Sequence, residues 1–190
     1  MDVCSGSGIP AQHLFLETGH FQSLVLTDKF PVNVNFADTR IQYLNQVCDI
    51  TTMPFDKAHF YTMLNAFHHF DKDEQNSMIQ RCEEAGAELY IVEILEPTFI
   101  CLLKVILAGT LGVLFLSPFI GKMTWKKFLL TYILPLNILT ITFDGMISVF
   151  KSKSHKKFEK QFQTVSKQIK VQRMNSLAGP TTIIHIQHAH

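Results

Sequence analysis

Residues 1–11, MDVCSGSGIPA, decide the fold that this sequence predicts. An acidic residue, Asp2, precedes the tight turn Gly6-Ser7-Gly8, and a helix-compatible run begins near Ala11. Glycine has no Cβ, so the backbone can turn sharply and approach a ligand closely. The free N–H groups at the start of the following helix point at such a ligand. The stretch therefore predicts a binding site for a nucleotide-type cofactor.

The rest of the chain predicts alternating strands and helices. Short apolar runs are typical of buried parallel strands, and they cover residues 23–28, 61–67 and 89–94. Asp71 and Glu74 form a capping-box pattern for a helix that we expect to end at Gly86. Two β-rich runs, 169–176 and 181–187, flank a turn at residues 178–180 and predict a hairpin. We therefore expect an α/β fold with a Rossmann-like doubly wound sheet, mostly parallel, with a C-terminal antiparallel hairpin.

Two further acidic residues fit the same ligand as Asp2. Asp28 ends the second predicted strand, 20 residues after Gly8, where doubly wound folds bind ribose hydroxyls. Asp49 follows another β-like run and suits the amino group of an adenine. All three acids would lie at the carboxyl ends of parallel strands, where such sheets bind ligands.

The glycine pattern alone leaves other interpretations open. It fits a plain connecting turn, and it fits the dinucleotide fingerprint of nicotinamide-dependent oxidoreductases. The chain has no matching Tyr-Lys or Cys-His signature for an oxidoreductase. Three features favour S-adenosylmethionine instead: the acid four residues before Gly6, the pair Asp49-Ile50 in the next unit, and the terminal hairpin.

Several segments carry a family resemblance. DVCSGSG, VLTDKFP, VCDITTMPF, MLNAFHHF and ELYIVEILEP occur in the order seen in class I S-adenosylmethionine-dependent methyltransferases. LLTYILPLNILTITFDGMISVF and AGPTTIIHIQ resemble a bacterial subfamily of these enzymes with a long apolar insert after the fifth strand. The resemblance covers nearly the whole chain. It implies S-adenosyl-L-methionine as the cofactor and the transfer of its methyl group to a small or lipid-like acceptor.

The resemblance also assigns roles to individual residues. It implies cofactor contacts with the methionine part by Asp2, Gly6 and Gly8, with the ribose by Asp28, with the adenine by Asp49 and Ile50, and with the region of the methyl group by Asn65. Cys4 lies in the same cofactor loop, at a position where the family usually has glycine, and a cysteine is found there in the subfamily that this chain resembles.

The family's first strand is central to its sheet, and only its last one or two residues precede the glycine turn here. Loss of a central strand would expose two sheet edges and remove apolar burial. We expect either a fragment of a longer protein or a neighbouring segment that fills the gap, and poor folding in isolation. The alternative to an active enzyme is a non-catalytic, truncated, methyltransferase-like protein associated with a membrane.

Two histidines, His68 and His69, follow the fourth predicted strand, where residues of this fold face the substrate. One of them is a candidate catalytic general base, because the pKa of histidine lies near the working pH. The alternative is structural, with one ring packed under the insert and the other at the start of the helix beginning at Asp71. Methyl transfer often needs no strong base, because positioning of the reactants supplies much of the rate.

Residues 98–150 are strongly apolar: 99–120 carry one charge, Lys104, and 128–143 carry none. A bilayer span takes about 20 apolar residues. Both flanks belong to one sheet, so two spans would translocate the lysines of residues 121–127, against the positive-inside tendency. Two helices in the membrane interface, with Trp125 and these lysines at headgroup level, fit better. A soluble lid and a spanning hairpin are the alternatives.

Composition narrows the remaining possibilities. The formal net charge of +1 gives no electrostatic case for nucleic acid. Four scattered cysteines without a C-x-x-C pair favour free thiols in a reducing compartment, and we expect no signal peptide. We therefore expect a cytoplasmic protein, with peripheral contact with the membrane face as an option. His185, His188 and His190 lack cysteine or carboxylate partners at metal-binding spacing, so no metal site is expected.

The expected organisation has three parts. Residues 1–97 form the cofactor-binding core, residues 98–150 the apolar helical insert, and residues 151–190 a basic helix and a hairpin that complete the core. In the basic segment, Phe158 and Phe162 lie four residues apart and supply the buried stripe of a solvated helix over 151–170.

Overall fold

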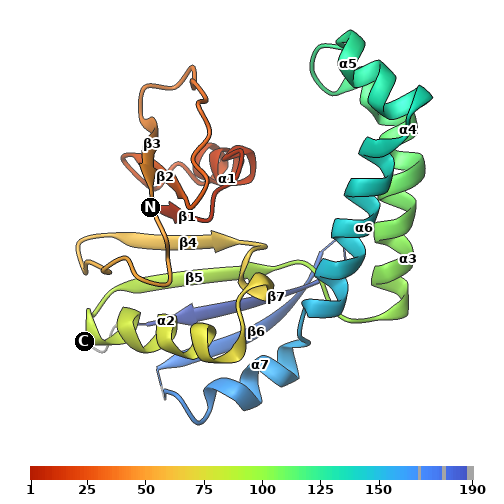
Figure 1. The fold of residues 1–190 in the computed structure, drawn as a ribbon. Coiled ribbons are helices and arrows are strands. Elements are labelled where there is room, and N and C mark those ends of the chain that lie inside the picture. Colours follow the sequence, from red (N-terminus) through yellow and green to blue (C-terminus); the bar gives the residue numbers. More distant parts are fainter. Residues whose placement is uncertain (167, 177–178, 188–190) are drawn as a thin grey trace. The chain divides into compact units, whose positions relative to one another are not determined.

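The computed structural model describes residues 1–166, 168–176 and 179–187. The chain divides into two compact units, each described by itself below (Figure 1). Unit 1 comprises Met1–Ile94 and Ser154–His190, and unit 2 comprises Leu95–Lys153.

Unit 1 contains a sheet of seven strands in the order β3-β2-β1-β4-β5-β7-β6. The strands are β1 (Asp2–Val3), β2 (Leu24–Asp28), β3 (Ile41–Val47), β4 (Phe60–Leu64), β5 (Glu88–Glu93), β6 (Ile169–Ser176) and β7 (Gly179–Ile186). Strands β1 to β5 pair in parallel, and β7 pairs antiparallel with both β5 and β6. The predicted fold class, a mostly parallel Rossmann-like sheet with a C-terminal antiparallel hairpin, is confirmed.

Helices cover this sheet. They are α1 (Ile9–Thr18), the 3-10 helix η1 (Phe67–His69), α2 (Lys72–Glu84) and α7 (His155–Phe162). The capping box that the sequence predicts is present: the Asp71 side chain accepts the N–H groups of Asp73 and Glu74, and the Glu74 side chain accepts that of Asp71. Gly86 follows the helix with φ 64°, which favours glycine.

Three details differ from the sequence prediction. The apolar run 61–67 forms a strand only as far as Leu64, and Phe67 begins the 3-10 helix η1. The helix expected over 151–170 is shorter, because α7 ends at Phe162, and a turn follows it. Phe158 and Phe162 of this helix are buried, as expected. The two rings lie one turn apart, so their packing stabilises only a short helix. Gly179 and Pro180 already belong to β7 rather than to the predicted turn, and Ala178 lies outside the described residues.

The core of unit 1 is built from alternating strand residues. Ala11 and Phe15 of α1 pack with Leu24 and Leu26 of β2 in one cluster. A second, larger cluster joins residues of β1, β4, β5 and β7 with α2 and α7, and its members include Tyr61, Met63, Met78, Leu89, Phe158 and Phe162. Because successive side chains of a strand point to opposite faces, the strands can contribute to packing on both sides.

Strand β1 is short but lies at the centre of the sheet. Asp2 pairs with Leu26 and Thr62, and Val3 pairs with Thr27 and Met63. Strands β2 and β4 each begin two residues before these partners. A cavity of about 380 Å³ lies beside the first residues of β2 and β4, which extend beyond β1. Its lining includes Met1, Phe21, Leu24, Val25 and Phe60.

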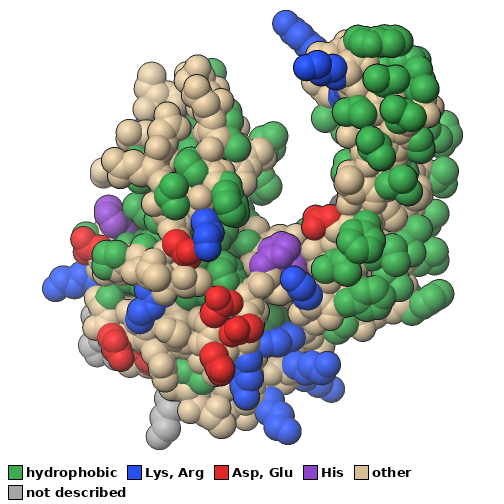
Figure 2. Space-filling model, viewed as in Figure 1, with side chains coloured by type: hydrophobic (Ala, Val, Ile, Leu, Met, Phe, Trp, Pro, Cys, Tyr) green, Lys and Arg blue, Asp and Glu red, His purple; other side chains and the backbone are tan. Residues whose placement is uncertain are grey.

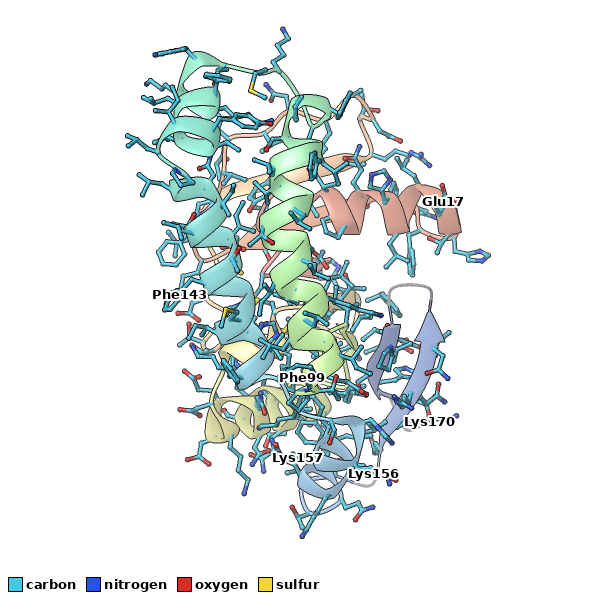
Figure 3. The ribbon with its side chains drawn as sticks, turned by 90° about the vertical axis from the view of Figure 1, so that its right-hand side faces the viewer. Glu17, Phe99, Phe143, Lys156, Lys157 and Lys170 are labelled. Atoms are coloured by element: carbon cyan, nitrogen blue, oxygen red, sulfur yellow. The ribbon has the colours of Figure 1, made fainter. Side chains whose placement is uncertain are left out.

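Unit 2 is helical throughout most of its length. Its first helical run comprises α3 (Phe99–Leu107), the π-helix η2 (Ala108–Gly112), α4 (Val113–Leu116) and the 3-10 helix η3 (Ser117–Phe119). The second comprises α5 (Trp125–Phe128), the π-helix η4 (Leu129–Ile133) and, after a 70° bend at Leu134–Pro135, α6 (Leu136–Lys151). Figures 1 and 3 show α3 and α6 side by side.

Two glycines allow the helices of unit 2 to approach closely. A Cβ added to Gly109 would lie 2.6 Å from Thr142 Oγ1, and one added to Gly145 would lie 2.6 Å from Val105 Cγ1. Both distances are too short for a real contact, so any larger residue would push α3 and α6 apart.

Candidate cofactor site at the carboxyl edge of the sheet

The topology of unit 1 creates a binding edge. Strands β1 to β5 are parallel, so their carboxyl ends lie at one edge of the sheet. The strand order runs outward from β1 through β2 to β3 on one side, and through β4 to β5 on the other. The order therefore reverses between β1 and β4, and ligands of open α/β sheets bind at such a switch point.

The glycine turn follows β1 at this edge. Three residues of the turn adopt positive φ: Cys4 at 57°, Gly6 at 53° and Gly8 at 74°. The Ser5 N–H donates to the Thr27 carbonyl over 3.0 Å, and the Tyr43 hydroxyl donates to the Gly6 carbonyl over 2.9 Å. These bonds hold the turn against β2 and β3.

The two glycines of the turn have different surroundings. A Cβ added to Gly8 would lie 2.5 Å from Leu26 Cδ1, so packing against β2 requires glycine there. Gly6 is exposed, and a Cβ added to it would meet nothing within 4 Å. The backbone at Gly6 is therefore open to a ligand, whereas Gly8 has a structural reason to be glycine.

Asp28 lies directly beside this open backbone. Its Oδ2 accepts the Gly6 N–H over 2.8 Å, and its Oδ1 accepts the Phe30 N–H over 2.8 Å. The side chain is half-buried at the carboxyl end of β2. The structure thus brings together two residues that the sequence predicts for the cofactor, and the carboxylate keeps lone pairs for further donors such as ribose hydroxyls.

Asp49 occupies the loop after β3. Its Oδ2 lies 2.8 Å from Lys29 Nζ, and its Oδ1 accepts the N–H and the hydroxyl of Thr51 over 3.0 and 2.7 Å. The hydrogen bond from Lys29, with those from Thr51, lowers the pKa of Asp49 to about 2. The neighbouring Ile50 is only 2% exposed and packs in the core, so its side chain is not offered to a ligand.

Asp2 is buried beneath the turn. Its Oδ1 accepts the Thr62 hydroxyl over 2.6 Å, and its backbone carbonyl accepts the hydroxyls of Ser5 and Thr27. Burial raises the pKa of Asp2 to about 6. Burial likewise raises the pKa of the Cys4 thiol to about 12, so the thiol stays protonated. These two predicted residues support the turn from inside rather than line its open side.

Asn65 follows β4 with φ 53°, a conformation that is uncommon for residues other than glycine. Its N–H donates to the Val92 carbonyl over 2.7 Å, and its Oδ1 accepts the Ile94 N–H over 3.4 Å. These bonds connect the carboxyl ends of β4 and β5. Strained backbone of this kind clusters at functional sites.

His68 follows β4, and Glu93 is the last residue of β5. The two side chains form a buried pair. His68 Nδ1 lies 2.7 Å from Glu93 Oε2, and each side chain is 1% exposed. Glu93 Oε1 accepts the Phe67 N–H over 2.7 Å, and His68 Nε2 is buried without a hydrogen-bond partner among the described residues. His69 is exposed, and its ring centroid lies 4.3 Å from that of His68.

Glu93 was missed at the level of the sequence. The signal was an acid inside the apolar run LYIVEI, because a buried carboxylate needs a partner. Tyr43 and Thr62, which bond to the turn and to Asp2, carried no such signal.

Three cavities of unit 1 lie away from the predicted site residues. Those of about 550 and 380 Å³ are lined by residues at the amino ends of β2, β4 and β5, including His59, Phe60 and Glu88. One of about 390 Å³ is lined by residues of α7 and β6 and of the turn between them. Across the described residues, no group of three or more His, Cys, Asp or Glu side chains could hold a metal ion. His188 and His190 lie outside the described residues, and His185 Nε2 lies 2.8 Å from Glu88 Oε1.

Comparisons with known proteins agree on the fold. No model of a known protein family matches the sequence, and no curated protein does. Among solved structures, human N-acetylserotonin methyltransferase in complex with S-adenosylmethionine is similar, with a TM-score of 0.55 and 14% identity over 99% of this chain and 47% of the other. Mitomycin 7-O-methyltransferase MmcR gives 0.54 and 17%, over 99% and 48%. An S-adenosylmethionine-dependent methyltransferase from Aquifex aeolicus gives 0.53 and 13%, over 99% and 80%.

The similarity is one of fold. This chain spans less than half the length of the first two of these structures, 47% and 48%. One further structure with a TM-score of 0.53 and 12% identity, over 98% of this chain and 42% of the other, is described as a pericyclic reaction enzyme, so the fold hosts more than one chemistry. Unit 1 therefore has the Rossmann-like fold found in S-adenosylmethionine-dependent methyltransferases.

Proposed function

We propose that this chain binds S-adenosylmethionine at the carboxyl edge of its sheet and transfers the methyl group to a small or lipid-like acceptor. The observation that carries the proposal is the bond between the Asp28 carboxylate and the open Gly6 backbone, in the loop after β1, the strand that borders the switch point of the sheet. Solved neighbours of the same fold include methyltransferases in complex with this cofactor, which supports the proposal.

The donor set fits the cofactor part by part. Asp28 offers carboxylate lone pairs to the two ribose hydroxyls, and the exposed turn at Gly6 offers backbone groups to the methionine part. Asp49 would accept from the adenine amino group beside its bonds to Thr51 and Lys29. When bound, the cofactor supplies a methyl group already activated by the positive sulfur, so the protein's main task is to position the acceptor.

The His68–Glu93 pair gives the proposed site a means of holding a proton. If Nδ1 donates to the Glu93 carboxylate, the tautomer is fixed and Nε2 is left with a free lone pair. A histidine held in this way can accept a proton from an acceptor's hydroxyl or amine as the methyl group is transferred. Asn65 would hold the loop between this pair and the glycine turn, through its bonds to β5.

We also propose a cytoplasmic location, without nucleic acid as a partner. The four cysteines are free, which is typical of a reducing compartment, and the charge balance gives no general attraction to a polyanion.

Calorimetric titration of S-adenosylmethionine into the full chain, in mild detergent, tests the cofactor site. Asp28→Asn removes the negative charge, and we expect it to weaken binding at least about tenfold, because a hydrogen bond to a charged group contributes about 1.5–3 kcal/mol. The control is Asp56→Asn, since the Asp56 carboxylate also accepts a backbone N–H, that of Ala58, but precedes β4 at the opposite edge. Equal affinity of both variants, or no binding by a folded chain, would contradict the proposal and favour a non-catalytic protein.

A further inference from the structure

Unit 2 exposes apolar side chains around its helices rather than along one side. On the first helical run, from α3 to η3, Lys104 is the only charged residue, and the exposed side chains are otherwise apolar; they include Phe99, Leu103, Leu107, Leu111, Phe115 and Phe119. On α6, exposed apolar residues include Leu139, Ile141, Phe143, Ile147 and Phe150. Figure 2 shows this coating of hydrophobic side chains, and Figure 3 shows Phe143 pointing away from α3.

Several polar side chains of the hairpin are bonded within it, whereas the buried hydroxyl of Thr142 has no hydrogen-bond partner among the described residues. The Thr110 hydroxyl donates to the Ile106 carbonyl over 2.6 Å, and the Thr140 hydroxyl donates to the Leu136 carbonyl over 2.8 Å. Two more bonds cross between segments, from the Tyr132 hydroxyl to the Leu114 carbonyl and from Asn137 Nδ2 to Thr131 Oγ1, over 2.8 and 2.9 Å. Internal pairing of this kind is what a hydrocarbon environment demands of polar groups.

Charged residues gather at the two ends of the hairpin. Residues 105–121 and 128–143 carry no charge. At the tip between them, Lys127 Nζ donates to the carbonyls of Ser117 and Ile120, which closes the end of the first helical run. Lys122, Lys126 and the 69%-exposed Trp125 complete the tip, a composition typical of a headgroup layer.

We propose that unit 2 is a helical hairpin that crosses the hydrocarbon core of an anionic phospholipid bilayer. Its first run, Phe99–Phe119, has 21 residues and a single charge, Lys104; at 1.5 Å per residue it is about 31 Å long, which matches a core of about 30 Å. Both ends of unit 2 join unit 1, so the chain must cross an even number of times. This proposal stands apart from the proposed methyl transfer.

The surface of the hairpin distinguishes crossing from lying flat. A helix that lies in the interface needs a strongly polar face. Lys104 is the only charged residue on the exposed surface of the first run, so this run has no such face. Lys104 lies in the second turn of α3, towards the base of the hairpin, where its long side chain can snorkel to the near headgroups. Asp144 lies seven residues before the end of α6, in the half of the hairpin nearer the base. The three lysines of the tip, at 122, 126 and 127, count against crossing under the positive-inside tendency, but the five lysines that follow the base, at 151, 153, 156, 157 and 160, outnumber them on the side of unit 1.

Trp125 is the single tryptophan of the chain and reports the position of the tip. We would reconstitute the full chain in vesicles of phosphatidylcholine and phosphatidylglycerol, and select those with unit 1 outside through a C-terminal affinity tag. Iodide enclosed in the vesicles should quench Trp125 fluorescence, and iodide added outside should not. Quenching from outside alone would place the tip at the near surface and overturn the proposal, as would a chain that fails to float with the vesicles.

A charge in the middle of the hairpin provides a second, independent test. Leu111→Lys places an ammonium at a 50%-exposed position of η2, and Leu16→Lys places one at a 44%-exposed position of α1 in unit 1. We expect the first variant to reduce the fraction that floats after a carbonate wash at least about tenfold, since a charge at mid-span costs about 3 kcal/mol. The second should float like the wild type. Equal flotation of the two would overturn the proposal, and circular dichroism and cofactor titration would show separately whether unit 1 is intact.

Discussion

Asp2 illustrates how one buried carboxylate supports the site and weakens the fold. It lies at the centre of the sheet, bonds to the Thr62 hydroxyl and anchors Ser5 and Thr27 through its carbonyl. Burial raises its pKa to about 6, against about 3.9 in an unfolded chain. The folded chain therefore binds more protons than the unfolded chain between about pH 4 and pH 6.

The sign of the resulting pH dependence follows directly. The contribution of Asp2 to stability is fully present below about pH 4 and is lost as the pH rises through 6. The neutral variant Asp2→Asn should raise the free energy of unfolding at pH 8 by up to about 3 kcal/mol, and should change it much less at pH 4.5. Urea unfolding at both pH values measures this difference. Exposed Asp56→Asn is the control, and a gain from Asp2→Asn that is the same at both pH values would contradict the account.

The tautomer of His68 is a second property of single residues. Glu93 faces Nδ1 of His68, whereas Glu88 faces Nε2 of His185. A carboxylate accepts, so the proton of neutral His68 should lie on Nδ1 and that of His185 on Nε2. Long-range ¹H–¹⁵N spectra of the imidazoles at pH 8 should show opposite tautomers for the two rings. A proton on Nε2 of His68 would exclude the proton-accepting role that we propose for that nitrogen, whatever the tautomer of His185.

At the scale of elements, the short strand β1 should limit stability. It pairs with two residues of each neighbour, and the cavity of about 380 Å³ lies beside the start of β2 and β4. An engineered extension of alternating apolar residues ahead of Met1 would fill this space, and each buried side chain would contribute about 1.5–3 kcal/mol before its ordering cost.

Thermal unfolding of unit 1 measures this effect. We expect the midpoint to rise by several degrees with a Val-Thr-Val-Leu extension, because about 1 kcal/mol shifts Tm by roughly 2–4 °C in a domain of this size. An extension of Gly-Ser-Gly-Ser has the same length and should leave the midpoint unchanged. Equal midpoints for the two extensions would show that the gap beside β1 does not limit stability.

Elements with strong local signals were predicted correctly from the sequence. The capping box at Asp71 and Glu74 and the glycine at 86 set the ends of α2 by local chemistry alone. Apolar runs likewise gave β2 and β5 within one residue. The helix predicted over 151–170 was too long. The polar composition of this segment does not show where the packing of Phe158 and Phe162 against the core ends.

The candidate site was predictable where its geometry is local. The glycine turn and Asp28 follow from their positions after β1 and β2, and the structure joins them through one hydrogen bond. Glu93, Tyr43 and Thr62 were missed because their partners lie on other strands, so only the folded sheet brings them together. The structural reason for glycine at position 8 was missed for the same reason, because the side chain that excludes a Cβ there, Leu26, lies on another strand.

At the scale of the whole molecule, the chain combines a fold found in S-adenosylmethionine-dependent methyltransferases with a unit whose exposed surface is mostly apolar. No charged residue interrupts the middle of the hairpin, whereas unit 1 buries its apolar residues in two clusters. A lipid-like acceptor would reconcile the two units, because it would be concentrated in the bilayer that unit 2 enters. The division also separates the tests, since cofactor binding depends on unit 1 and flotation on unit 2.

The central claim is that the cofactor binds at the carboxyl edge of the sheet. Hydrogen–deuterium exchange of the full chain, with and without S-adenosylhomocysteine, tests it most directly, because binding slows exchange in the segments it orders. We predict protection of residues 4–8, 28–30 and 49–52, which form the loops after β1, β2 and β3. Protection confined to residues 20–25 and 57–60, which line the cavities at the opposite edge, would contradict the claim.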